Sequence, residues 1–66
     1  MSRDLIKSHW TRLGGKLRSK FSRLTIDDVS FGEGDRVYLI GRLKERYGLT
    51  SEAAQLKVAQ FERLLT

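Results

Sequence analysis

Hydrophobic residues recur every three or four positions along most of the chain, which is the spacing of one face of an α-helix. Three such stripes are present: Ile6, Trp10, Leu13 and Leu17; then Leu39, Leu43 and Tyr47; and last Ala54, Val58, Phe61 and Leu65. The chain contains no proline, the residue that breaks helix interiors. The pattern predicts an all-α fold, and glycines and capping residues divide it into five segments.

Glycines indicate where helices should end. The pair Gly14-Gly15 predicts a turn or a close approach. It divides a first helix, from about residue 2 to 14, from a short second one that ends near Phe21. Gly48 is expected to end a later helix, because glycine adopts the left-handed C-cap conformation readily. Gly41 lies inside that helix, where glycine costs roughly 1 kcal/mol relative to alanine. Gly41 is therefore interpreted either as tolerated strain or as a close contact with another helix, and we favour the close contact.

Short polar side chains indicate where three helices should begin. Thr25 and Asp28 have the spacing of a capping box, in which each side chain bonds to the backbone N–H of the other residue. Asp35 and Thr50 are the N-cap candidates of the next two helices. We therefore expect a helix from about residue 25 to the glycines at 32 and 34, another over about 35–47, and a last one over about 51–65.

Two stretches of the chain are alike. Residues 13–22 match residues 39–48 at an offset of 26, with Leu-x-Gly-basic-Leu-basic-x-basic-aromatic in both. The match pairs Leu13, Gly15, Leu17 and Phe21 with Leu39, Gly41, Leu43 and Tyr47. Each half is too small to bury its own apolar face. The duplication predicts two similar helical hairpins packed together.

The residues of this repeat resemble the CsbD-like family of small bacterial general-stress proteins, over nearly the whole chain. The matching positions are Trp10, Leu13, Gly15-Lys16, Phe21, Leu24-Thr25, Asp27-Asp28, Glu33-Gly34, Arg36, Leu39, Gly41, Leu43 and Glu45-Arg46-Tyr47-Gly48. The chain departs from the pattern at Ser8, where Gly is common, at Phe21-Ser22, which replaces Trp-Gly, and at Lys44, which replaces Gln. The Ser22 change puts a tight glycine turn after the first hairpin in doubt.

The resemblance implies one domain over residues 1–66, with four to five short helices in two roughly orthogonal hairpins. It implies an association with general stress response but no established molecular activity. We expect the most important residues to be structural: Trp10, Leu13, Gly15, Leu17, Phe21, Leu39, Gly41, Leu43, Tyr47, Gly48 and Phe61.

Positive charge gathers in the first third of the chain. The net charge is +5, and residues 1–24 hold seven basic residues against one acid, whereas residues 25–35 hold four acids and no base. The basic residues either solvate helix faces or attract a phosphate backbone. In the second interpretation Gly14-Gly15 would offer backbone N–H groups to phosphate. The candidate nucleic-acid contacts are Lys7, Arg12, Lys16, Arg18, Lys20 and Arg23.

The sequence offers little for catalysis or for a cofactor. His9 is the only histidine, it adjoins Trp10 on a mostly apolar face, and the chain has no cysteine. No calcium-loop or phosphate-loop spacing is present. We therefore expect a protein that is not an enzyme and has no catalytic, metal or cofactor-binding residue.

Other partners stay open at this point. A protein partner could contact the acidic 27–35 segment or Tyr38. Tyr38 lies outside the Leu39–Leu43–Tyr47 stripe, so it is the aromatic residue most expected to be exposed, although it could equally cover a hairpin edge. No apolar run approaches the roughly 18 residues that a membrane span needs. We expect a cytoplasmic monomer without a membrane partner.

Overall fold

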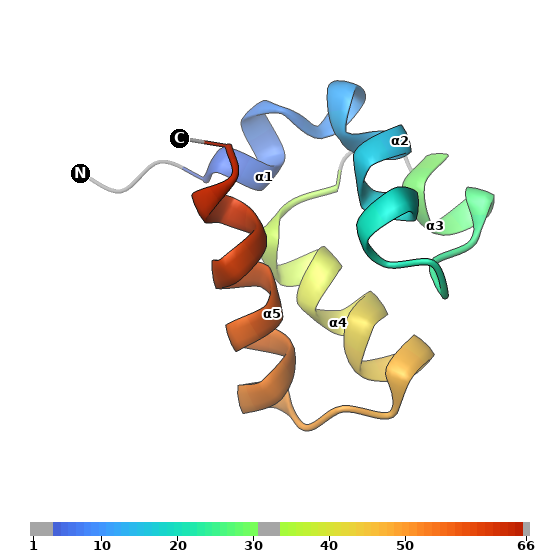
Figure 1. The fold of residues 1–66 in the computed structure, drawn as a ribbon, viewed down its shortest axis with the longest axis vertical. Helices are drawn as coiled ribbons and strands as arrows, with labels where there is room; N and C mark the ends of the chain where they lie inside the picture. Colours follow the sequence, from blue (N-terminus) through green and yellow to red (C-terminus); the bar gives the residue numbers. More distant parts are fainter. Residues whose placement is uncertain (1–3, 31–33, 66) are drawn as a thin grey trace.

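The computed structural model describes residues 4–30 and 34–65, and in these two ranges the chain forms helices and no strands. The helices are α1 (Leu5–Ser8), α2 (Trp10–Lys20), α3 (Ile26–Ser30), α4 (Arg36–Tyr47) and α5 (Ser51–Arg63), as labelled in Figure 1. The predicted all-α class is confirmed. The third helix was predicted to end at the glycines at 32 and 34, of which Gly32 lies outside the described residues.

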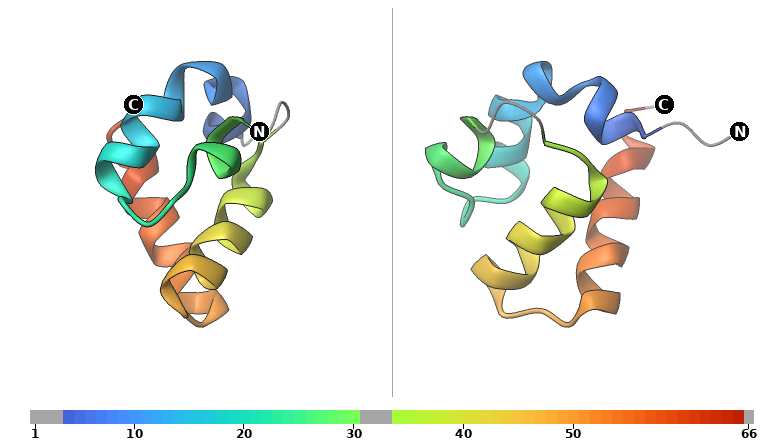
Figure 2. Two further views of the ribbon diagram at one scale, coloured as in Figure 1. Left: turned by 90° about the vertical axis from the view of Figure 1, so that its right-hand side faces the viewer. Right: turned by 180° about the vertical axis from the view of Figure 1, so that it is seen from behind.

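The helices pair as two hairpins, with α2 packed on α3 and α4 packed on α5. Figures 1 and 2 show α4 and α5 side by side, joined at one end by a short loop, with α1 and α2 at the other end of this pair. Helix α1 contacts both α2 and α4 and so links the hairpins. The sequence repeat therefore corresponds to a structural one, in which α2 and α4 begin at the equivalent positions Trp10 and Arg36.

The first break in the chain falls at His9, and the prediction of a turn at Gly14-Gly15 is wrong. The Asp4 side chain caps α1 by accepting a hydrogen bond from the N–H three residues on at 2.9 Å, and His9 ends this helix with φ −110° and ψ 9°. Both glycines lie inside α2, between Leu13 and Leu17, which are 2% and 0% exposed. A continuous helix keeps both leucines in the core, and their burial outweighs the cost of two glycines.

The predicted helix starts at Thr25, Asp35 and Thr50 are confirmed. Thr25 Oγ1 accepts from the Asp28 N–H at 3.1 Å, and Asp28 Oδ2 accepts from the Thr25 N–H at 2.9 Å, which completes the capping box. Asp35 and Thr50 each accept from the N–H three residues on, at 2.8 and 3.2 Å. Gly48 ends α4 in the left-handed region with φ 64°, as predicted.

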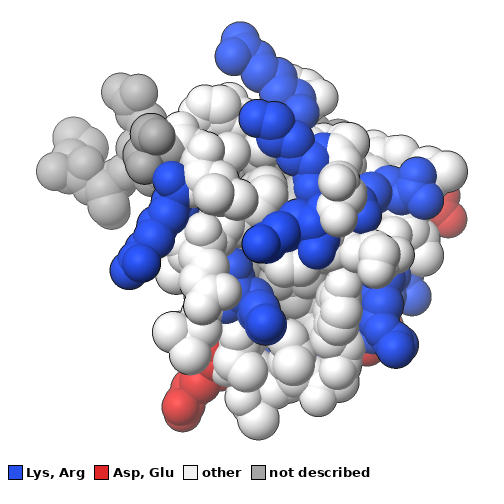
Figure 3. Space-filling model, viewed as in Figure 1, with Lys and Arg blue, Asp and Glu red and all other residues white. Residues whose placement is uncertain are grey.

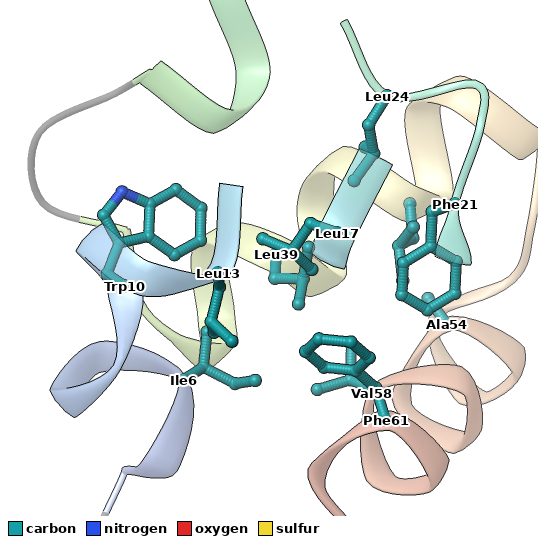
Figure 4. Close-up of a cluster of buried hydrophobic side chains, with 11 residues drawn as sticks. Ile6, Trp10, Leu13, Leu17, Phe21, Leu24, Leu39, Ala54, Val58 and Phe61 are labelled. Carbon is teal, nitrogen blue, oxygen red and sulfur yellow. The ribbon is translucent and has the colours of Figure 1, made fainter. Parts of the chain in front are cut away.

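Eleven hydrophobic side chains form one core between the hairpins: Ile6, Trp10, Leu13, Leu17, Phe21, Leu24, Leu39, Leu43, Ala54, Val58 and Phe61. Figure 4 shows that they converge from α1, α2, α4, α5 and the α2–α3 loop. Tyr47 and Leu65 are only half-buried, and they pack against the edge of this core. The stripes thus predicted the core correctly apart from the last residue of two of them.

The predicted close helix contact at Gly41 is wrong, and the tight approach lies at Gly34. A Cβ at Gly41 or at Gly15 would have nothing within 4 Å. A Cβ at Gly34 would lie 2.2 Å from the Trp10 ring. The chain that leads into α4 therefore passes directly against the indole, and this position has no room for a side chain.

Candidate functional site

The six predicted nucleic-acid contacts are all exposed. Lys7 lies on α1 and Arg23 in the α2–α3 loop, and α2 carries the other four, Arg12, Lys16, Arg18 and Lys20. None of the six forms an ion pair with an acid in residues 4–30 or 34–65. Figure 3 shows Lys and Arg side chains gathered over the part of the surface where α2 lies, with Asp and Glu at the margins.

The structure brings three of these residues into one row. Arg12, Lys16 and Lys20 are four residues apart on α2, so they lie on one flank of the helix, beside the buried stripe. Arg18 lies on the opposite flank of α2. We call Arg12, Lys16 and Lys20 the α2 basic row.

Arg23 is already engaged within the fold. Its backbone N–H donates to the Tyr47 hydroxyl at 3.3 Å, and its guanidinium lies 5.8 Å from the centre of the Tyr47 ring. This contact joins the loop of the first hairpin to the end of α4. The predicted offer of glycine N–H groups to phosphate is wrong, because Gly14 and Gly15 lie within the hydrogen-bonded interior of α2.

The arginines of α4 differ from the lysines and arginines of α2 because they are ion-paired. Arg36 Nε lies 3.1 and 3.2 Å from the Glu62 carboxylate oxygens on α5, and its backbone N–H donates to Asp4 at 3.2 Å. Arg42 pairs with Glu45 one turn on. These cations hold the fold together, whereas those of α2 face solvent.

Asp28 is the centre of a polar cluster that sequence reasoning missed. Its side chain is 5% exposed, and Arg46 donates to both carboxylate oxygens, from Nε at 2.8 Å and from Nη2 at 3.0 Å. Arg42 Nη1 lies 3.8 Å from Oδ1. The hydrogen bonds from Arg46 lower the pKa of Asp28 from 3.8 to about 2, although burial alone would raise it. The same pairing raises the pKa of Arg46.

Tyr38 belongs to this cluster, and the expectation that it is exposed is wrong. Its ring packs edge-on against Trp10, with centroids 5.6 Å apart, and the Arg42 guanidinium lies 5.8 Å from the centre of the Tyr38 ring. Its hydroxyl donates to the Asp28 carbonyl at 2.8 Å. Burial is the main cause that raises its pKa. Asp28 is buried and Tyr38 is half-buried, and both make their contacts within the protein.

His9 lies at the junction of α1 and α2. Its Nδ1 is 2.9 Å from the Leu5 carbonyl and 3.2 Å from the Ser8 hydroxyl, and the residue is half-buried. In the described ranges no three His, Cys, Asp or Glu residues lie close enough together to hold a metal ion.

One hollow lies where the end of α2 meets α4 and α5, and a second lies between α2 and α5. The first, of about 280 Å³, is lined by Phe21, Leu43, Tyr47 and Leu49 together with Lys20 and Lys57. The second, of about 360 Å³, is lined by Phe61, Leu64 and Leu65 together with Lys16 and Lys20. Two residues of the α2 basic row, Lys16 and Lys20, therefore line these hollows together with apolar side chains.

These features define a small helical protein with a packed core and a basic flank. In the described residues no helix is both long enough and apolar enough to cross a membrane. No family model matches the chain. Individual relatives do match, over nearly the full length of both chains.

The relatives place the chain in a family. It is 45% identical over 65 residues to a UPF0337 protein of Xanthomonas axonopodis pv. citri, covering 98% of this chain and 94% of that one. It is 41% identical over 61 residues to a UPF0337 protein of Pseudomonas aeruginosa, covering 92% and 94%. It is 34% identical over 62 residues to the UPF0337 protein YjbJ of Escherichia coli K12, covering 94% and 90%. The chain belongs to the UPF0337 family.

Proposed function

We propose that this chain is a CsbD-like protein that serves in general stress response without being an enzyme. The support is the motif resemblance, above all Leu39-x-Gly41-x-Leu43-x-Glu45-Arg46-Tyr47-Gly48. The structure gives these residues structural work, since Leu39 and Leu43 are in the core and Arg46 holds Asp28. These residues of the motif stabilise the fold, so we look for the functional residues on the exposed surface.

The stress role is tested by protein abundance. We expect the amount of this protein per cell, measured by quantitative mass spectrometry, to rise several-fold on osmotic or ethanol stress. An unchanged amount under every stress tried would contradict the role.

We further propose that the working surface is the exposed basic side of α2 and that its partner is nucleic acid, bound without marked sequence preference. The observation that carries this proposal is the contrast between cations that are paired in the fold and cations that are not. Arg36, Arg42 and Arg46 have acidic partners, whereas Arg12, Lys16, Arg18 and Lys20 have none in the described residues. Unpaired cations along one helix attract a phosphate backbone at no cost to the fold.

A salt titration tests this proposal. Labelled duplex DNA and RNA are titrated with the protein at about 50 and 200 mM salt, because each phosphate contact releases counterions and steepens the salt dependence. We expect binding at low salt that falls steeply with added salt and is the same for unrelated sequences. Absence of binding at the lower salt concentration would contradict the proposal.

Matched variants separate a specific surface from net charge. Lys16→Ala/Arg18→Ala/Lys20→Ala removes three charges from α2, and Lys44→Ala/Lys57→Ala/Arg63→Ala removes three from α4 and α5. We expect the first variant to lose most of its affinity and the second to keep it, with helicity by circular dichroism unchanged in both. Equal losses would show that only the net charge matters.

A further inference from the structure

The α2 basic row includes a cluster of hydrogen-bond donors. Lys16, Ser19 and Lys20 are three and four residues apart on α2, so their side chains are neighbours on the helix surface. All three are exposed, and all three line the hollow of about 360 Å³ between α2 and α5. We call these three residues the α2 donor cluster. It presents two ammonium groups and one hydroxyl to the same volume.

The α2 donor cluster has the chemistry of a phosphate site. Lysine and serine side chains are among the groups with which proteins hold the phosphate oxygens of a nucleic acid. In residues 4–30 and 34–65 none of these three side chains forms a hydrogen bond or an ion pair. Their donors can therefore bind a phosphate without breaking a contact of the fold.

The length of the row fits a phosphate backbone rather than one isolated phosphate. Arg12 lies eight residues before Lys20, which is about 12 Å along the axis of α2. Over that length a duplex carries roughly seven phosphates, counting both strands, and one strand carries about half of them. The three cations of the row can therefore contact successive phosphates of one strand.

The aromatic residues beside the row bear on the choice between a duplex and a single strand. Proteins that bind single strands stack the bases on accessible aromatic rings. Trp10 and Phe21, which flank the row in the sequence, are each 6% exposed and lie in the core. Neither ring offers a face to a base. The attraction then depends on charge, and a duplex has about twice the linear charge density of one strand.

We propose that the α2 basic row binds one phosphate backbone of a nucleic-acid duplex, in preference to a single strand, with a phosphate held by the α2 donor cluster. This inference rests on the proposed nucleic-acid function. It adds the form of nucleic acid, the row that contacts it and one uncharged contact, Ser19. The duplex backbone is stiff, with a persistence length of about 50 nm, so its phosphates are ordered before they bind.

Fluorescence anisotropy with a short labelled DNA duplex and with each of its unstructured single strands tests the preference. We expect the duplex to bind about fivefold more tightly than either strand at about 50 mM salt, because each contact releases more counterions from it. Equal or tighter binding of the single strands would overturn the inference and leave the proposed function standing. Absence of binding by both forms at this salt concentration would remove both.

The salt dependence counts the phosphate contacts. Three contacts on a duplex give about a 40-fold loss of affinity between 50 and 200 mM salt, a log–log slope of about −2.7. Arg12→Ala should make this slope shallower by about one. Lys44→Ala, which removes an exposed cation from α4, should leave the slope unchanged. A slope steeper than about −5, or equal changes in the two variants, would overturn the assignment to the row.

Ser19→Ala tests the α2 donor cluster without changing any charge. We expect it to weaken duplex binding about three- to tenfold with the same salt slope, because one hydrogen bond to phosphate is lost. Ser30→Ala, at the exposed end of α3, is the matched control and should have no effect. Circular dichroism checks that each variant is folded. If folded Ser19→Ala binds the duplex as tightly as the parent protein, Ser19 does not hold a phosphate and the proposed contact is wrong.

Discussion

The two hairpins differ most in their second helix. Helix α3 has five residues and α5 has 13, although both begin after a threonine N-cap. Helix α5 buries Ala54, Val58 and Phe61, whereas the only buried residue of α3 is Asp28. The second hairpin is therefore closed mainly by apolar packing, whereas α3 of the first hairpin is held to α4 by the polar contacts of Asp28.

Asp28 compensates for the short helix. It completes the cap of α3 and reaches Arg46 on α4, and its carbonyl accepts from Tyr38 on the same helix. The equivalent position in the second hairpin is Ala53, three residues after Thr50, which makes no such contact. The two hairpins thus keep the same architecture, although α5 is held by buried apolar side chains and α3 by the ion pair between Asp28 and Arg46.

The largest expected effect on stability comes from the core leucines that the two halves of the repeat share. Leu17 and Leu43 occupy equivalent positions and are both 0% exposed. We expect Leu17→Ala and Leu43→Ala each to lower the free energy of unfolding by about 2–5 kcal/mol, because each leaves a cavity in the one core. Urea denaturation measures the effect. If only one variant is destabilised, the two hairpins do not contribute equally to the core.

The ion pair between Asp28 and Arg46 gives the second largest expected effect on stability, and this effect depends on pH. A folded pKa of about 2 against 3.8 corresponds to roughly 2–3 kcal/mol of stability at neutral pH. This contribution is complete above pH 3.8 and is lost as the pH falls through about 2, because the carboxylate then takes up a proton. We expect Asp28→Asn to lower stability at pH 7 by about that amount and to match the parent protein near pH 2.

Thermal melts at a series of pH values check this prediction. Asp27→Asn, an exposed neighbour on the same helix, is the matched control and should change stability little. An equal loss of stability in Asp28→Asn at pH 7 and pH 2 would show that the contribution of Asp28 does not depend on its charge.

The contact between Gly34 and Trp10, where the chain passes from the first hairpin to the second, gives the third largest expected effect on stability. Gly34→Ala would place a Cβ 2.2 Å from the Trp10 ring, so the ring or the backbone must move. We expect a loss of about 1–3 kcal/mol, typical of overpacking. Trp10→Leu in the same background should recover part of the loss, since it removes the ring. No recovery in the double variant would contradict this explanation.

The smallest expected effect is a gain in stability rather than a loss. Gly15→Ala on α2 and Gly41→Ala on α4 each fill open space in a helix interior. We expect each to raise the free energy of unfolding by about 0.5–1 kcal/mol, because glycine costs backbone entropy in a helix. A loss of stability in either variant would indicate a close contact at that glycine.

Local signals in the sequence predicted the fold well. The apolar stripes located the core, and Thr25, Asp35, Thr50 and Gly48 gave three helix starts and one helix end. The error at Gly14-Gly15 arose because tertiary burial of the flanking leucines overrode local propensity. Such an override is invisible until the packing partner of the helix is known.

The surface was harder to predict. The six basic residues are exposed as expected, but only the regular four-residue spacing of Arg12, Lys16 and Lys20 indicated which of them share a flank. Asp28 and Arg46 are 18 residues apart, and no short-range pattern joins them. The two hollows were missed because they depend on which helices do not pack together. The stripes predict which faces are buried but not against which neighbour.

Gly34 leaves room for the indole of Trp10, the only tryptophan in the chain, which is 6% exposed. The protein therefore carries one intrinsic fluorophore in an apolar setting, at the place where the chain crosses from the first hairpin to the second. Its emission should lie at short wavelength in the folded state and move to longer wavelength as this crossing opens. A single optical signal then reports on the joint between the two halves, without any label.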